Sequence, residues 1–208
     1  MFHDNIIQLR LLTRNREKKM QLYGSTTSPY VRRLKIWLHD DEYEFVELDI
    51  MSKEGHQLLK QKNPTLKVPV LFDVNQAIYD SNVIYRYLNE KFSREKLNWD
   101  DENNLTLINA ANDSFVELLL LDRSGISPDS DVMFIKRQIA RNKGLMPLLN
   151  EKVANGEFDQ WHYPAISLYC LVDWIIFREL FDLSELTALT EFVKKHQDKA
   201  GVSDSDPR

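Results

Sequence analysis

Residues 22–34 read Leu-Tyr-Gly-Ser-Thr-Thr-Ser-Pro-Tyr-Val-Arg-Arg-Leu, and this pattern predicts a short strand, a turn and a helix. Ser28 is suited to cap the helix and Pro29 to begin it, because serine is favoured at the N-cap and proline at the first helical position. The Ser28 hydroxyl would then lie at the positive end of the helix, where an anion such as a thiolate is stabilised. The weaker candidates for the same place are Ser25, Thr26 and Thr27.

Two further motifs follow in the same half of the chain. Residues 63–71 read Asn-Pro-Thr-Leu-Lys-Val-Pro-Val-Leu and lead into an apolar strand. The general frequency of cis bonds predicts a trans peptide bond before Pro69, since only about 5–6% of X-Pro bonds in folded proteins are cis. Asp80 and Ser81 precede an apolar helical pattern, so they are expected to cap a helix whose N-terminus can bind an anion.

Composition narrows the class of protein. The chain has 208 residues and a formal net charge of −5, which argues against a nucleic-acid partner held by phosphate contacts. Cys170 is the single cysteine, so no intrachain disulfide can form and a reducing, cytoplasmic location is expected. It lies in an apolar run and is expected to be buried and inert. No stretch has the length of a membrane span, and no zinc-type spacing of cysteine and histidine occurs, so neither a membrane nor a metal is expected.

Hydrophobic periodicity divides the chain into two halves. The predicted strands are 20–23, 43–50, 68–72 and 77–79, and the helices among them are 29–39, 53–61 and 81–92. In the last of these helices the expected apolar stripe is Val83, Ile84, Tyr87 and Leu88. Only helices are predicted later, at 101–121, 131–152 (bent at Gly144 and Pro147), 164–181 and 183–195, followed by a tail at 201–208. The predicted domains are an α/β domain at 20–93 and an all-helical domain at 101–208, with 1–19 a disordered leader or a start assigned upstream of the true one.

The order and spacing of these motifs resemble the glutathione S-transferase family. The Ser28-Pro29-Tyr30 turn is similar to that of serine-type members, notably the plant tau class, and the helical half resembles that of bacterial members. The 63–71 segment resembles the family's second signature, and Asp80-Ser81 resembles its acidic residue-serine pair. The resemblance runs from Met20 to the last residue and implies a thioredoxin-like domain followed by an all-helical domain.

The resemblance also implies a role for each motif. Ser28 would donate a hydrogen bond to the sulfur of glutathione, the co-substrate, and hold it as a thiolate for attack on an electrophilic small molecule or a peroxide. Lowering the pKa of a thiol from about 8.5 to about 6.5 requires about 2.7 kcal/mol, which suits one charge-assisted hydrogen bond at a helix N-terminus. The other implied glutathione contacts are Lys53, Lys67, Val68, a cis Pro69, Asp80 and Ser81.

Other expectations follow from the same resemblance. A homodimer is implied, and an electrophile pocket between the domains, with a guessed lining of Tyr30, Asn112, Phe115 and Trp161. The buried helix of the family begins with Ser/Thr-x-x-Asp, but here the matching residues are His162 and Ala165, so the reciprocal cap is lost.

Three other functions are alternatives to a glutathione transferase. A non-catalytic protein of the same fold that binds protein partners, similar to the stringent starvation proteins, is the main alternative, and the retained motifs argue against it. A thiol oxidoreductase would need cysteine in place of Ser28. A maleylacetoacetate isomerase usually shows Ser-Ser-Cys at this turn, which this chain lacks.

Overall fold

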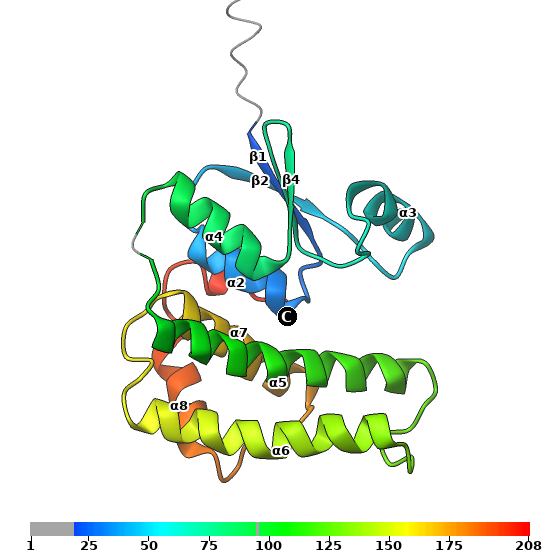
Figure 1. The fold of residues 1–208 in the computed structure, drawn as a ribbon, viewed down its shortest axis with the longest axis vertical. Helices are drawn as coiled ribbons and strands as arrows, with labels where there is room; N and C mark the ends of the chain where they lie inside the picture. Colours follow the sequence, from blue (N-terminus) through cyan, green and yellow to red (C-terminus); the bar gives the residue numbers. More distant parts are fainter. Residues whose placement is uncertain (1–18, 95) are drawn as a thin grey trace, which may run out of the picture. The chain divides into compact units, whose positions relative to one another are not determined.

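The computed structural model describes residues 19–94 and 96–208, which form two compact units. The first unit contains the described residues up to Leu34 and residues Leu38–Arg94, and the second contains Lys35–Trp37 and the residues that follow Arg94 (Figure 1). The predicted leader at 1–19 lies outside the described residues, apart from Lys19.

The first unit is built on a four-stranded sheet in the order β2-β1-β3-β4. Its strands are β1 (Met20–Gly24), β2 (Tyr43–Glu47), β3 (Val70–Asp73) and β4 (Gln76–Tyr79). β1 and β2 are parallel, and β3 is antiparallel to both of its neighbours. The sequence predicted a mixed sheet with helices on its two faces, and this is the thioredoxin-like fold that the family resemblance implied.

The two faces of this sheet are covered by different helices. Tyr23 and Val70 pack with Leu59 of α3 (Lys53–Lys62) in one apolar cluster. Side chains alternate along a strand, so Leu22 and Leu71 point to the other face. Figure 1 shows α2 (Pro29–Trp37) and α4 (Ser81–Lys91) on that side of the sheet, and α3 on the opposite side.

The predicted apolar stripe of α4 was wrong at Val83, and Tyr87 is only half-buried. Val83 is 47% exposed, whereas Tyr85, which the prediction left out, is 4% exposed. The buried positions follow i, i+3, i+4, i+7 and i+8 from the N-terminus of the helix, which is the spacing of one helix face. They are Ser81, Ile84, Tyr85, Leu88 and Asn89. Val83 falls outside that face, so its apolar character alone misplaced it.

Two predicted strands begin or end elsewhere for identifiable reasons. β2 ends at Glu47, because Leu48 closes the pairing with a hydrogen bond to the Gly24 carbonyl and the chain then turns at Asp49. β3 begins at Val70, directly after Pro69, which has no backbone N–H to give to a neighbouring strand.

The second unit is helical throughout its described regular structure. Its elements are α5 (Trp99–Arg123), α6 (Met133–Ala154), α7 (Tyr163–Arg178), α8 (Thr187–His196) and the short 3-10 turn η1 (Ser203–Ser205). α6 continues through both Gly144 and Pro147. Within residues 19–94 and 96–208, none of these helices has the length and hydropathy that crossing a bilayer requires.

α7 is the central helix of this unit, as its nearly continuous apolar sequence predicted. All of its residues from Tyr163 to Ile175 are buried, and Cys170 is a free, fully buried thiol. The predicted tail at 201–208 is instead packed, since Val202 and Ser205 are each 3% exposed. Arg208 holds it to α7 with hydrogen bonds of 3.0 and 3.2 Å to the carboxylate of Asp173.

Candidate functional site

The pairing of the strands brings the predicted motifs of the first unit to one edge of the sheet. Tyr23 at the end of β1 pairs with Val70 at the start of β3, and Val70 pairs with Tyr79 at the end of β4. The turn after β1, the loop before β3 and the start of α4 therefore all leave the sheet at the same edge. β2 ends there too, because the Leu48 amide donates to the Gly24 carbonyl at 2.8 Å.

The turn after β1 places Ser28 at the N-cap of α2. The Ser28 amide donates to the Ser25 carbonyl at 3.1 Å, and the Ser28 carbonyl accepts from Arg32 at 3.0 Å. Gly24 allows α2 to approach the strand this closely, since a Cβ atom there would lie 2.4 Å from Cγ2 of Val31. The small residue before the turn and the serine cap thus act together to fix the helix start.

The four hydroxyl groups of this turn differ in their hydrogen bonds. Thr26 donates to Oε1 of Glu47 at 2.9 Å, and the hydroxyls of Ser25 and Thr27 bond each other at 3.2 Å. Ser28 Oγ accepts a long hydrogen bond of 3.4 Å from the Val31 amide. Among the described residues nothing accepts the Ser28 hydroxyl hydrogen. The bond between Ser25 and Thr27 uses the hydrogen of only one of the two hydroxyls. Ser28 is therefore one of two hydroxyls of the turn with a hydrogen to donate, and it is the one at the N-cap of α2.

The loop before β3 is shaped by a buried asparagine. Asn63, 1% exposed, donates from Nδ2 to the Lys67 carbonyl at 2.6 Å. Its Oδ1 accepts from both the amide and the hydroxyl of Thr65 at 2.9 Å. The loop then passes through Val68-Pro69, whose peptide bond is cis, as the family resemblance implied. Neither this role of Asn63 nor that of Glu47 was predicted, because no local pattern shows which distant groups a polar side chain will meet.

α4 begins with the two polar residues that the sequence singled out. Asp80 Oδ1 accepts from the amides of Asn82 at 2.9 Å and Val83 at 3.2 Å, so it is the N-cap. Asp80 adopts φ 71° and ψ 134°, a conformation that non-glycine residues rarely take and that persists mostly at functional sites. Ser81 behind it is 2% exposed.

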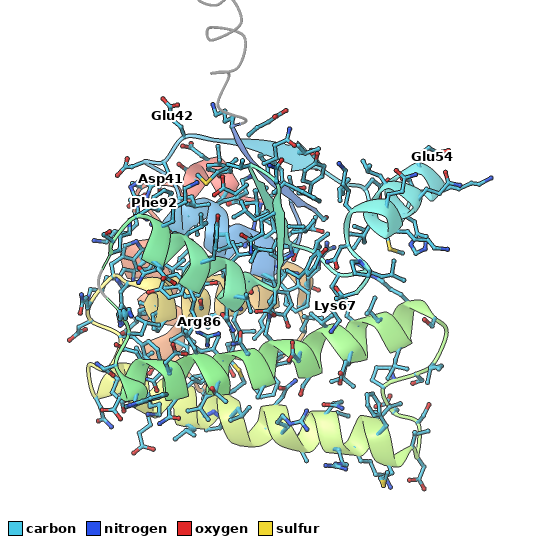
Figure 2. The ribbon with its side chains drawn as sticks, turned by 45° about the horizontal axis from the view of Figure 1, so that its top comes forward. Asp41, Glu42, Glu54, Lys67, Arg86 and Phe92 are labelled. Atoms are coloured by element: carbon cyan, nitrogen blue, oxygen red, sulfur yellow. The ribbon has the colours of Figure 1, made fainter. Side chains whose placement is uncertain are left out.

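The two predicted lysines are exposed and lie on different elements. Lys53 is the first residue of α3, whose N-cap Ser52 accepts from the Gly55 amide at 3.0 Å. Lys67 lies in the loop before β3, and Figure 2 labels it together with Glu54, the second residue of α3. His56 of α3 is also exposed. A third lysine, Lys62, lies over the rings of Tyr23 and Phe72 and was not predicted.

The largest pKa shift of the first unit lies at the other end of β3. Burial, and then the 2.7 Å hydrogen bond to Asp73, raise the pKa of Tyr87 to about 12. A second polar group of this unit joins Asp41 to Arg94 at 2.7 Å, with the Arg94 guanidinium over the Phe92 ring; Figure 2 labels Asp41 and Phe92. Both groups join secondary-structure elements and lie away from the edge where the motifs meet.

The residues guessed as the lining of an electrophile pocket have other surroundings. Tyr30 lies under the guanidinium of Arg33, at 5.0 Å. Phe115 belongs to the apolar core of the second unit, and Trp161 stacks on His196 at 4.7 Å. Asn112 is fully buried in α5. Tyr30 and Trp161 are partly exposed, whereas Asn112 and Phe115 are buried, and none of these contacts tests the guess.

A comparison with known protein families matches a segment that contains most of the first unit. Residues 22–96 match the family model described as "Glutathione S-transferase, N-terminal domain". This part of the chain is therefore similar to the N-terminal domain of glutathione S-transferases. The matched segment contains Ser28, the Asn63–Pro69 loop and Asp80-Ser81, so the predicted motifs all lie in the family's N-terminal domain.

The similar curated proteins differ in how much of the chain they match. A protein of Caenorhabditis elegans, "Probable maleylacetoacetate isomerase", is 27% identical over 192 residues, covering 91% of this chain and 72% of that protein. "Glutathione S-transferase U18" of Arabidopsis thaliana is 36% identical over 77 residues, covering 36% of this chain and 33% of the plant protein. The sequence identity to the plant protein is thus higher than that to the Caenorhabditis protein, but this match covers only about a third of each sequence.

Solved glutathione transferases share the fold over most of the chain. A transferase from Methylobacillus flagellatus with glutathione bound has a TM-score of 0.78 at 19% identity, covering 91% of this chain and 100% of that one. A tau-class transferase from mango has a TM-score of 0.71 at 21% identity, covering 92% and 94%. The structures therefore support the two-part fold that the sequence predicted.

Proposed function

We propose that this chain is a glutathione transferase in which Ser28 activates the thiol of bound glutathione for attack on an electrophilic small molecule. The observation that carries the proposal is the Ser28 hydroxyl, which caps α2 and has no acceptor among the described residues for its hydrogen. A thiolate there would accept this hydrogen bond and lie at the positive end of the helix, and both effects favour the anion.

The remaining glutathione contacts are proposed from the family resemblance. The backbone of Val68, before Pro69, would pair with the cysteinyl part of glutathione as an added strand. The N-terminus of α4, with Asp80 and Ser81, would hold the γ-glutamyl group, since a helix N-terminus favours a carboxylate. Lys53 and Lys67 would meet the glycyl carboxylate. Glutathione is the co-substrate in this proposal, and a homodimer, a cytoplasmic location and a peroxidase side activity remain predictions.

Calorimetric titration with glutathione tests the proposal. Ser28→Ala is expected to bind glutathione with an affinity within a few fold of wild type and to lose most of the turnover with an electrophilic substrate, since the hydroxyl acts on the sulfur. Thr27→Ala is the matched control and should keep both properties. If wild type fails to bind glutathione at millimolar concentration, the non-catalytic alternative, in which the chain binds protein partners, replaces the enzyme proposal.

The Caenorhabditis relative makes an isomerase the second candidate, because that match spans 91% of this chain. The two candidates differ in the fate of glutathione. A transferase incorporates glutathione into its product, whereas an isomerase that uses glutathione as a cofactor releases it unchanged. Measuring glutathione consumption per turnover with maleylacetoacetate distinguishes them: rapid product formation without consumption would favour the isomerase.

A further inference from the structure

Two arginines lie at the same end of the helical unit. α5 and α7 run in the same direction, since Asp101 in the first turn of α5 bonds His162 at the start of α7 at 2.9 Å. Farther along, Phe115 of α5 contacts Phe181, just beyond α7, with ring centroids 5.9 Å apart. Arg123 and Arg178, the last residues of these two helices, therefore belong to the same end of the unit.

Neither arginine has an anionic partner in the described part of the chain. Arg178 is partly buried, its Nε is buried without a hydrogen-bond acceptor, and its guanidinium lies 4.4 Å from the centre of the Phe177 ring. The acids next to these arginines in sequence, Asp122 and Glu179, are exposed and form no ion pair with them. This contrasts with Arg208, whose guanidinium bonds the carboxylates of both Asp173 and Asp206.

The arginines are also not needed as caps for the helix ends. The α5 carbonyls of Leu120, Leu121 and Asp122 accept backbone hydrogen bonds from the turn that follows. Those of Ile175 and Ile176 in α7 accept from Leu180 and Glu179. The negative ends of the two helix dipoles offset part of the cost of placing cations here. Within residues 19–94 and 96–208, no carbonyl takes a hydrogen bond from either guanidinium.

Placing the unpaired cations of Arg123 and Arg178 at one end of the unit is unfavourable unless an anion binds there. Burial, and then the charge of Arg123, lower the pKa of Arg178 below its ordinary value, which means that its surroundings disfavour the cation. A partly buried charge without a partner costs free energy, and departures of this kind in a native protein are typical of functional sites.

We propose that Arg123 and Arg178 form a binding site for an oxyanion at the C-terminal ends of α5 and α7. Guanidinium groups match the planar, bidentate geometry of carboxylate, phosphate and sulfate oxygens. The buried Nε–H of Arg178 supplies one donor, the exposed Arg123 side chain supplies others, and the Phe177 ring is an apolar surface beside Arg178. The ligand is a free inorganic oxyanion or the anionic group of an organic molecule. The proposal does not depend on glutathione transferase activity.

Thermal and chemical unfolding with added phosphate tests this site, with chloride at matched ionic strength as the reference. A ligand that binds only the folded state, at ten times its dissociation constant, raises the ratio of folded to unfolded protein about elevenfold. Wild type should show such an increase with phosphate. Arg178→Met and Arg123→Met should each lose most of it, whereas Arg137→Met, which removes an exposed arginine of α6, should keep it.

The NMR signal of the Arg178 Nε–H gives a readout that a general salt effect would not move. It should shift on titration with phosphate in wild type and in Arg137→Met. Benzoate, an organic carboxylate, distinguishes the two ligand sources: tighter binding than phosphate indicates an organic anion, and weaker binding an inorganic one. Equal stabilisation of all four proteins by phosphate, or an unmoved Nε–H signal with both anions, would overturn the proposal.

Discussion

The hydrogen bonds of Ser28 differ from those of its neighbours in the turn. Thr26 is held by Glu47, and Ser25 and Thr27 hold each other, so these three hydroxyls fix the loop. Ser28 caps α2 mainly through its backbone, with only a 3.4 Å contact to its Oγ. Its hydroxyl hydrogen thus remains available to a ligand while the helix start stays in place.

Gly24→Ala is expected to destabilise the protein at this turn. The added Cβ would lie 2.4 and 2.8 Å from the two γ-carbons of Val31, which is fully buried, so α2 must shift. Overpacking of this kind costs about 1–3 kcal/mol of the free energy of unfolding. Urea denaturation measures the loss.

Gly144→Ala is the matched control for this substitution. Gly144 lies inside α6 and has open space around the position of a Cβ, so alanine should stabilise the helix by about 0.5–1 kcal/mol. A similar change in both variants, in either direction, would contradict the packing argument at Gly24.

At the scale of the element, α7 begins without a side-chain cap at its N-terminus. His162 is the N-cap residue, but its side chain makes no capping bond and instead contacts Asp101 of α5 at 2.9 Å. Ala165, where the family has an acid, is fully buried in the apolar core. The start of α7 is therefore held by a contact with another helix.

Asp101→Ala is expected to weaken this start. His162 Nδ1 is already buried without a hydrogen-bond partner, so the substitution leaves both ring nitrogens without one. The loss should be about 1–2 kcal/mol in the free energy of unfolding. Asp100→Ala removes an exposed acid from the same helix turn and should cost about 0.3–1 kcal/mol, through the helix dipole alone. Equal losses would show that the contact with His162 contributes nothing.

α8 carries a buried histidine that makes stability depend on pH. His196 is 2% exposed, stacks on Trp161 and bonds the Phe192 carbonyl through Nδ1 at 2.8 Å. Burial lowers the pKa of its imidazole, so the unfolded chain binds a proton more readily than the folded one. The contribution to stability is therefore complete above the ordinary pKa of about 6.5 and is lost as the pH falls below it.

Chemical denaturation between about pH 7.5 and 5.5 measures this dependence. As the pH is lowered, the free energy of unfolding should decrease less steeply in His196→Gln than in wild type. His56→Gln, which replaces an exposed histidine of α3, should follow wild type. An unchanged slope in His196→Gln would contradict the argument.

At the scale of the whole molecule, the two-part fold was predictable from local patterns and the site only in part. The alternation of apolar residues, the proline and serine at helix starts and the buried run of α7 are visible in the sequence. The register that brings Tyr23, Val70 and Tyr79 together depends on pairing between distant strands. The hydrogen bonds of Glu47 and Asn63 depend on that pairing too, and so were missed.

The cis bond before Pro69 shows the same limit. Nothing in the local sequence favours it over trans, and the prediction rested on the resemblance to a family. Val83 was predicted to be buried because it is apolar, but it is exposed. Which face of α4 is buried depends on how the helix packs on the sheet. Local patterns thus predict elements, while faces and contacts require the assembled unit.

The ultraviolet absorbance of the glutathione thiolate, followed against pH in the presence of wild type and of Ser28→Ala, tests the central claim most directly. The pKa of glutathione bound to wild type should lie about two units below the ordinary thiol value of about 8.5, and that of glutathione bound to Ser28→Ala should return toward it. Bound glutathione that titrates at the same low pKa in both proteins would contradict the assignment of Ser28.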